Sequence, residues 1–199
     1  MFCTWLKKTK LEKTHNPPPK HFRNERVLAF AAGEIGVKEV PGKGDNPQVV
    51  KYHAYATVDN KQGMADSVPW CASFIAYCLE QVGMGSTNNK AARSYLKWGV
   101  SSAKDPLPGD IVVFWRGSKN GWQGHVGFLV EKKVNGQLYV LGGNQSDAVN
   151  IKMFTPYQVL DIRRSSKMHE LNDEERERLH LMAKRILMGE TISLADSLA

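Results

Sequence analysis

The stretch that decides the fold runs from Pro69 to Val82 and reads Pro-Trp-Cys-Ala-Ser-Phe-Ile-Ala-Tyr-Cys-Leu-Glu-Gln-Val. Its apolar residues recur at intervals of three and four, at Cys71, Phe74, Ile75, Cys78, Leu79 and Val82. This spacing predicts an amphipathic helix with one stripe facing a core. Pro69 suits the start of the helix, because its missing N–H is not needed there, and Gly83 ends it. Cys71 is therefore expected in the first turn, on the inward face.

The segments on either side differ in their periodicity. Helical spacing predicts further helices over residues 25–37, 49–55 and 90–98. Downstream, β-branched and aromatic runs predict strands over residues 111–115, 125–130, 138–141, 149–154 and 159–163. Asn135-Gly136 separates two of these runs and indicates a two-residue hairpin turn. Helices followed by mostly antiparallel strands predict an α+β fold.

Length and composition indicate one folded domain with appendages. The chain has 199 residues, a formal charge of +7 and an apolar fraction of 42%, which excludes wholesale disorder. No apolar run reaches the ~18 residues of a membrane helix, so a transmembrane segment is not expected. We expect a basic, partly disordered arm over 1–24, the main domain over 25–165 and a helical tail over 166–199. The arm would suit any polyanion, or only aid solubility.

The two ends carry further signals. The first residues lack the apolar h-region of about 7–15 residues that a secretory signal needs. We therefore expect synthesis in the cytoplasm without a cleavable signal peptide, which agrees with reduced cysteines. At the other end, Asn172 and Glu175 form a capping-box pattern. The apolar stripe of the helix that follows must pack on the domain, on a second copy or on a protein partner.

Cys71 and His125 stand out as candidates for chemistry. A thiol in the first turn of a helix meets unpaired N–H groups, which are expected to lower its pKa. His125 opens a predicted strand between Gly124 and Gly127, which we expect to keep space clear around the imidazole. An amide-rich segment, residues 142–145, follows the next strand. A cysteine nucleophile, a histidine base and an orienting amide form a cysteine triad, whereas Cys78 is expected to fill the core.

Five motifs occur in the order of a known family. They are Pro69-Trp70-Cys71-Ala72-Ser73-Phe74, Ala92-Arg93-Ser94-Tyr95, Pro108-Gly109-Asp110-Ile111-Val112-Val113-Phe114, Gly124-His125-Val126-Gly127-Phe128 and Leu141-Gly142-Gly143-Asn144-Gln145-Ser146-Asp147. The region from Glu25 to Ser165 resembles the CHAP-type (cysteine, histidine-dependent amidohydrolase/peptidase) proteins of the NlpC-like, papain-related superfamily. The similarity is greatest to the phage and bacterial subset with a Gly-Gly-Asn-Gln segment.

The resemblance implies a papain-like fold and hydrolysis of an amide bond in peptidoglycan. It implies Cys71 as nucleophile, His125 as base and Asn144 as third member of the triad. The family often has an acidic residue just before the Pro-Trp-Cys motif, for which Asp66 is the nearest candidate, with Ser67 and Val68 between. Zinc is not expected, because the cysteines and histidines lack zinc-ligand spacing. The cysteine–histidine mechanism requires neither a metal nor an organic cofactor.

Four side chains are candidates for substrate contact besides Asp66. Trp122, in a glycine-rich loop, is the better candidate for lining a groove. Trp70 and Trp115 would either line such a groove or pack in the core, and we favour core packing for both. Arg93 serves either an anionic group of the substrate or a structural ion pair.

Asn144 and Gln145 compete for the third position of the triad. A two-residue turn at Asn135-Gly136 would place Gly127 opposite Asn144, and Asn144 would then share a face of the sheet with His125. Gln145 would point to the other face. A bulge at Gly142-Gly143 would reverse the choice.

The leading functional hypothesis is a peptidoglycan hydrolase. It would be an N-acetylmuramoyl-L-alanine amidase or a peptide endopeptidase, as in a phage endolysin or a related lytic protein, and it would act at the cell wall after release. Peptidoglycan is the expected partner, with a protein partner or self-association through the C-terminal helix as a further option. The alternative is a non-catalytic wall-binding module. A nucleic-acid-binding function lacks a recognised motif.

Overall fold

A computed structural model describes residues 23–57, 63–168 and 170–193. Helices precede the sheet: α1 (Arg23–Gly33), α2 (Pro47–His53), α3 (Cys71–Gln81) and the 3₁₀ helix η3 (Ala92–Lys97). The sheet contains β1 (Val100–Ser101), β2 (Ile111–Trp115), β3 (Gly124–Lys132), β4 (Leu138–Gly142), β5 (Asn150–Phe154) and β6 (Val159–Arg164). The short helix η4 (Pro156–Gln158) precedes β6, and α4 (Asp173–Leu187) ends the order. The α+β prediction is confirmed.

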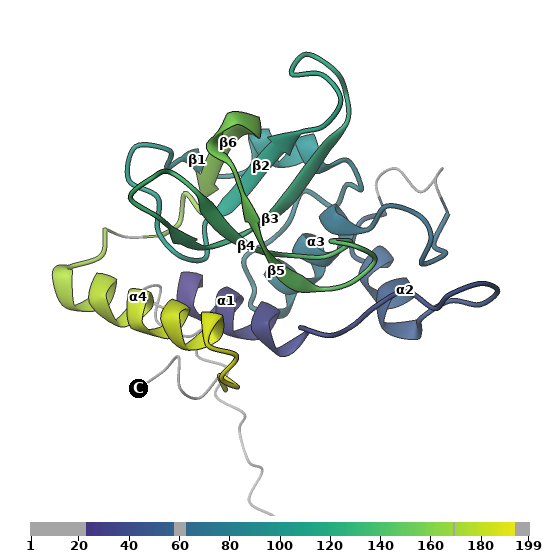
Figure 1. Cartoon of the computed structure of the whole chain (residues 1–199), viewed down its shortest axis with the longest axis horizontal. Coiled ribbons are helices and arrows are strands. Elements are labelled where there is room, and N and C mark those ends of the chain that lie inside the picture. Colours follow the sequence, from purple (N-terminus) through teal and green to yellow (C-terminus); the bar gives the residue numbers. More distant parts are fainter. Residues whose placement is uncertain (1–22, 58–62, 169, 194–199) are drawn as a thin grey trace, which may run out of the picture.

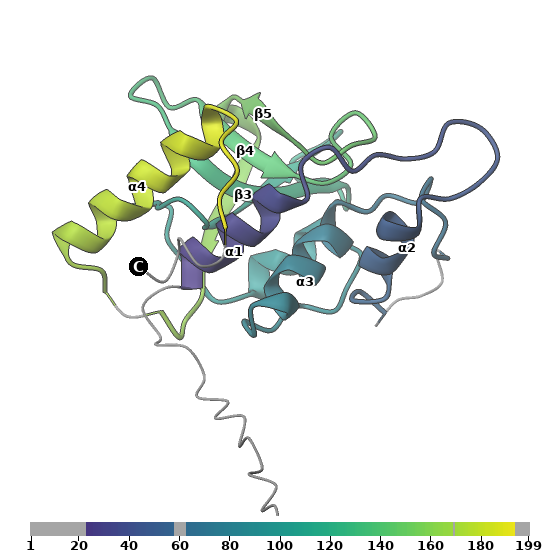
Figure 2. The same cartoon turned by 90° about the horizontal axis from the view of Figure 1, so that it is seen from below.

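Helix α3 lies next to α1 and α2 and packs on the sheet (Figures 1 and 2). Its residues from Cys71 to Leu79 are all buried, and it contacts α1, α2, β3 and β4. The helix is therefore apolar around most of its circumference, which is typical of a helix in the middle of a core. The prediction of a helix with Cys71 in its first turn is confirmed, whereas burial extends beyond the single stripe that was expected.

The six strands form one antiparallel sheet in the order β1-β6-β2-β3-β4-β5. Two strands separate β2 from β5, so their residues would lie about 14 Å apart in a flat sheet. However, the rings of Phe114 on β2 and Phe154 on β5 stack with centroids only 4.6 Å apart. The sheet therefore curls strongly, and its inner face encloses a second, smaller core away from the helices, formed by Val112, Phe114, Leu129, Leu138, Val140 and Ile162.

The β3–β4 hairpin differs from its predicted form. Lys133 N–H donates to the carbonyl of Gln137, so three residues form the loop instead of two, with Gly136 at φ 83°. A positive φ at the last loop residue is typical of a type I turn followed by a bulge. A second irregularity follows between Leu129 and Glu131. Together these shift the pairing by two residues, so that Phe128 pairs with Leu141.

Asp110, just before β2, joins the first helix to the last strand. Its buried carboxylate accepts hydrogen bonds from the Asn24 side chain at 2.9 Å, the Ser102 hydroxyl at 2.9 Å and the Leu107 N–H at 2.9 Å. The guanidinium of Arg164 on β6 donates to both carboxylate oxygens, at 2.9 and 2.7 Å. The Pro-Gly-Asp motif is thus explained by the fold, because its aspartate satisfies donors from α1, from the loop between β1 and β2, and from β6.

Helix α4 packs against α1 and β3 (Figures 1 and 2). Its predicted capping box is present, with Asn172 and Glu175 each accepting from the other's backbone N–H. Leu179, Met182, Ala183 and Ile186 are buried in the main core. Of the three options for this stripe, the structure shows packing on the domain itself.

The expected basic arm falls mostly on residues 1–22, which lie outside the described residues. Its last two positions begin α1, where Asn24 is buried. Among the described residues, no helix is long and apolar enough to cross a membrane.

Candidate active site

Cys71 is the first residue of α3 and is only 6% exposed. Its environment differs from the expected one, because burial raises the pKa of the thiol above its usual value. The positive charge of Arg116 and hydrogen bonds from the backbone N–H groups of Val126 and Ala72 act in the opposite direction. The predicted low pKa is therefore wrong for the resting protein: desolvation disfavours the thiolate more than the helix start favours it.

His125 lies on β3, next to Val126, whose N–H reaches the Cys71 sulfur. The imidazole is 1% exposed and stacks against Phe114 and Phe154, with ring centroids 6.1 and 5.6 Å away. Burial, together with the positive charges of Arg116 and Lys152, lowers its pKa to about 4. The imidazole is therefore neutral at pH 7.

Gln145 determines which nitrogen of His125 carries the proton. The Gln145 amide nitrogen donates to Asn150, at 2.7 Å to its carbonyl and 3.1 Å to its side chain, and more weakly to the Val140 carbonyl. The Oε1 atom of Gln145 therefore faces Nε2 of His125, at 3.0 Å, and must accept from it. With the proton on Nε2, Nδ1 holds a lone pair. Nδ1 is buried and has no hydrogen-bond partner within the described part of the chain, so it is a base ready to accept a proton.

The amide that binds His125 is thus that of Gln145, and the prediction that Asn144 would do so is wrong. The cause is the end of the strand: β4 ends at Gly142, and Asn144 leaves it at φ 54°. The shift of the hairpin by two residues would by itself have kept Asn144 on the face of His125. Ser146 and Asp147 also have positive φ values of 55° and 58°. A turn of this kind, rare for residues other than glycine, brings Gln145 back over the imidazole.

Two glycines make room for this arrangement. A Cβ atom on Gly142 would lie 3.1 Å from the Gln145 amide and 3.4 Å from Nε2 of His125. A Cβ atom on Gly143 would lie 2.5 Å from the Trp70 ring and 2.7 Å from Phe74. The first glycine therefore admits the Gln145–His125 contact, and the second admits the start of α3.

Gly124 and Gly127 have a different role from the expected one. A Cβ on Gly127 would meet Val140 at 2.4 Å, and one on Gly124 would meet the Phe114 carbonyl at 2.8 Å. These two glycines allow close approach of neighbouring strands, and the glycine that clears space at the imidazole is Gly142.

Trp70 and Asp66, both candidates for substrate contact, are buried. Trp70 is 0% exposed, and its indole N–H donates to Glu39 at 2.7 Å, which confirms core packing. Asp66 is 3% exposed and accepts from the N–H groups of Val40 and Asn46 at 2.8 and 2.9 Å. These bonds lower the pKa of Asp66. Asp66 therefore holds the loop before α2, and its carboxylate is occupied by backbone donors.

Arg93 forms no ion pair with the acidic side chains that the structure describes. Its guanidinium donates to three backbone carbonyls, those of Gln123, Lys119 and Ser118, at 2.8, 3.0 and 3.0 Å. It thereby fixes the loop between β2 and β3. Trp122 lies in this loop and is 80% exposed, so it remains available for contact with a substrate.

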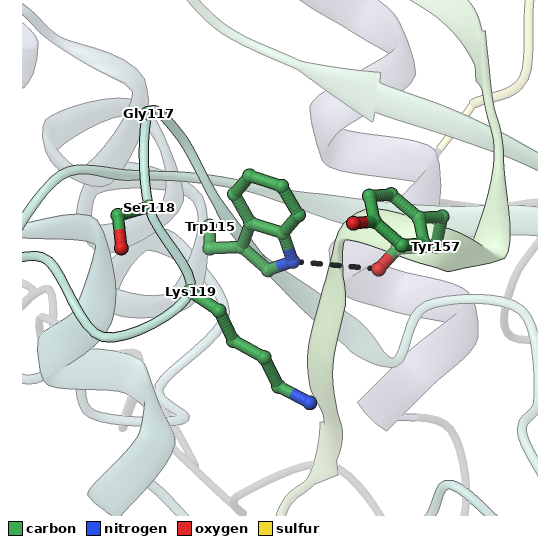
Figure 3. A pocket seen from close by; sticks show the side chains of 5 residues that line it. All are labelled: Trp115, Gly117, Ser118, Lys119 and Tyr157. Atoms are coloured by element: carbon green, nitrogen blue, oxygen red, sulfur yellow. Dashed lines mark hydrogen bonds between the residues drawn. The ribbon is translucent and has the colours of Figure 1, made fainter.

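A hollow of about 340 Å³ lies at the end of β2 (Figure 3). It is lined by Trp115, Gly117, Ser118, Lys119 and Tyr157, and neither Cys71 nor His125 contributes to its wall. The Trp115 indole N–H donates to the Tyr157 carbonyl at 3.3 Å, and the two rings pack edge to face. Trp115 therefore lines a surface hollow at the end of β2.

Arg116 is the residue near the site that the sequence analysis missed. It is exposed, yet its charge acts on both Cys71 and His125. The signal that could have found it is its position two residues after Phe114, which pairs with His125. No cluster of metal-ligating side chains occurs among the described residues.

Comparisons with known proteins locate the similarity in the same region. Residues 63–144 match the family model of the CHAP domain. This match covers less than half of the chain and includes Cys71 and His125, and it ends one residue before Gln145. The chain matches no curated protein.

Among solved structures, one similar chain is described as similar to lipoprotein, NLP/P60 family, from Staphylococcus aureus subsp. aureus Mu50. The sequence identity is 16% and the TM-score is 0.42. The alignment covers 80% of this chain and 46% of that chain, so the present protein spans about half of the similar one.

Proposed function

We propose that this protein is a cysteine hydrolase that cleaves an amide bond of peptidoglycan, with Cys71 as nucleophile, His125 as base and Gln145 as the orienting third member. The match of residues 63–144 to the CHAP domain supports the reaction class and the substrate. The observation that carries the residue roles is the Gln145–His125 hydrogen bond of 3.0 Å. It leaves Nδ1 of a neutral imidazole unprotonated, one residue from the N–H that reaches the Cys71 sulfur.

The resting pair is neutral, because burial raises the pKa of the thiol and lowers that of the imidazole. The proton therefore moves from Cys71 to Nδ1 as the sulfur attacks the carbonyl carbon of the scissile amide. Backbone N–H groups at the start of α3 lie beside the sulfur and can stabilise the oxyanion, an effect worth about 10²–10³ in rate for one donor.

Collapse of the tetrahedral intermediate breaks the carbon–nitrogen bond. The amine leaves with the proton held on Nδ1, and the acyl group stays on the sulfur as a thioester. His125 then takes a proton from water, the hydroxide adds to the thioester carbonyl, and the thiolate leaves and regains the proton. No metal or organic cofactor is needed for these steps.

The bond cut would be the muramoyl–alanine amide or an amide of the stem peptide or cross-bridge. Action at the cell wall after release, as in an endolysin or a related lytic protein, is the setting that this activity suits. The structure favours self-association through α4 less than the sequence alone does, because four apolar side chains of this helix are buried within the same chain.

The test is digestion of purified peptidoglycan followed by mass spectrometry of the new termini. Cleavage of the muramoyl–alanine amide should release a muramoyl carboxyl group and an alanine amino terminus. Cleavage within the stem peptide or cross-bridge should instead release a new amino terminus there, so the termini identify the bond. Cys71→Ala should abolish hydrolysis, whereas Cys78→Ala, its matched control on the same helix, should retain it. Intact sacculi that still bind the wild-type protein would favour the wall-binding alternative.

A further inference from the structure

Arg116 lies on the same face of the sheet as His125. The pairing of β2 with β3 continues one step past the end of β2, because Arg116 N–H donates to the Gln123 carbonyl at 3.2 Å. Phe114 pairs with His125, and their rings stack on one face. Since side chains alternate along a strand, Arg116 follows Phe114 on that face. It is therefore a diagonal neighbour of His125 at the open end of the sheet.

The charges around His125 are not balanced. Arg116 and Lys152, the two charged groups that act on its imidazole, are both positive. Arg116 also acts on the Cys71 thiol. The Arg116 side chain is exposed, and within the described ranges no acidic side chain forms an ion pair with it. By contrast, the nearby Arg93 is fully engaged with backbone carbonyls.

An exposed guanidinium beside two uncharged reacting groups is suited to an anionic ligand. Guanidinium binds carboxylate through two parallel hydrogen bonds, which fix position as well as charge. A carboxylate bound there would also offset the positive charge beside His125, and so would make Nδ1 a stronger base only while substrate is present.

We propose that Arg116 binds a carboxylate of the substrate close to the scissile amide, so that the enzyme selects peptide fragments in which this carboxyl group is free. This inference rests on the proposed function, which supplies the scissile amide, and it adds a specificity-determining residue to that function.

The first test uses two soluble stem-peptide fragments that differ only in whether the carboxyl group nearest the scissile bond is free or is a carboxamide. The wild type should prefer the free carboxylate by about 10–100-fold in kcat/KM, as expected for a charge-assisted pair. Arg116→Gln should abolish this preference by losing activity on the carboxylate fragment, and Arg116→Lys should retain part of it. Lys132→Gln, which removes the same charge at the far end of β3, should behave as wild type.

The second test does not depend on turnover. The rate of Cys71 alkylation by iodoacetamide, followed by mass spectrometry of the Cys71 peptide, reports both thiol ionisation and fragment binding. Arg116→Gln should alkylate more slowly at pH 7 than wild type. The carboxylate fragment should protect Cys71 better than the carboxamide in wild type, and equally in Arg116→Gln.

The outcomes separate the two proposals. A wild type that is protected selectively by the carboxylate fragment but cleaves neither fragment would overturn the proposed hydrolase and leave the carboxylate site standing. Equal protection or equal cleavage of both fragments by wild type would overturn the role of Arg116.

Discussion

The Nε2 atom of His125 lies 3.0 Å from the Oε1 atom of Gln145, and the Gln145 amide nitrogen is bound to Asn150. Since that nitrogen is committed to acceptors, the amide cannot turn over without losing two or more bonds. The tautomer of the imidazole is therefore fixed by Asn150 on β5 as well as by Gln145 itself.

Replacement of Gln145 should be much more harmful to catalysis than replacement of Asn144. Gln145→Ala removes the acceptor for Nε2–H and should lower kcat by about 10²-fold or more, as for other groups that orient a catalytic histidine. Asn144→Gly, which keeps the positive φ, should retain activity within a few-fold. Steady-state kinetics on soluble fragments, with circular dichroism as a check of folding, measures both. A greater loss for Asn144→Gly would reverse the assignment.

Stability should fall as the pH is lowered from about 6.5 toward 4. The pKa values of His53 and His125 are both lowered to about 4 in the folded protein. Between the folded and unfolded pKa values, only the unfolded chain binds these protons, so acid favours unfolding. Each histidine contributes at most about 3 kcal/mol, and the loss is complete below pH 4. Urea unfolding at pH 7.5 and 5.0 measures the change.

A variant separates the two histidines in that experiment. His53 is buried, with Nδ1 3.0 Å from the Ser73 hydroxyl. Burial lowers its pKa most and the charge of Lys90 lowers it as well, while Asp45 and Asp66 partly offset these effects. His53→Gln should reduce the difference in unfolding free energy between the two pH values by roughly half. An unchanged difference would mean that the pKa of His53 is the same in the folded and the unfolded protein.

Loss of the Asp110 carboxylate should destabilise the fold strongly. Asp110→Ala leaves the half-buried guanidinium of Arg164 without its carboxylate, together with donors from Asn24, Ser102 and Leu107. Breaking one side of a buried ion pair costs about 3–5 kcal/mol. Asp161→Ala, which breaks the more exposed pair with Arg163, should cost about 1 kcal/mol. Denaturant midpoints compare the two variants. Equal losses in the free energy of unfolding would show that the hydrogen bonds of Asp110 do not stabilise the fold more than those of Asp161.

We expect the main role of Arg93 to be stabilisation of the loop between β2 and β3. Arg93→Ala and Arg93→Lys both lose the three-carbonyl contact, since an ammonium cannot reproduce the fork of the guanidinium. Amide hydrogen exchange over residues 117–123 should accelerate in both variants, with a loss of about 1 kcal/mol in global stability. If Arg93→Lys kept wild-type exchange and activity, charge would be the property that matters.

Local patterns in the sequence were sufficient for much of this structure. The stripe from Cys71 to Val82 gave α3, the runs after Pro108 gave the strands, and Asn172 with Glu175 gave the capping box. Each of these depends on residues close together in the chain. The placement of Cys71 at the start of a buried helix followed from the same kind of pattern.

The details that decide the chemistry depend on distant residues. The hairpin loop at Asn135-Gly136 fits a two-residue turn as well as the observed three-residue loop, because Gly136 tolerates a positive φ in either. This loop and the bulge after Leu129 shift the pairing by two residues, which keeps each side chain on its predicted face. The exchange of Asn144 for Gln145 comes from the turn after Gly142, where Asn144 has a positive φ. The raised pKa of Cys71 comes from burial, which a helix start alone does not reveal. Arg116, which follows β2, acts on Cys71 and His125 through its charge, and the sequence around each of them does not reveal it.

The packing of α4 on α1 also has a consequence for the synthesis of the protein. Arg178 on α4 binds Glu25 on α1 at 3.1 Å, and these residues are 153 positions apart. Because the ribosome makes α1 first, the part of α1 that α4 covers stays in contact with water until almost the whole domain has been translated. A nascent chain stalled before residue 173 therefore presents an incompletely covered apolar surface. Chaperones would bind that surface, and they would lose it when Leu179 and Ile186 arrive to complete the core.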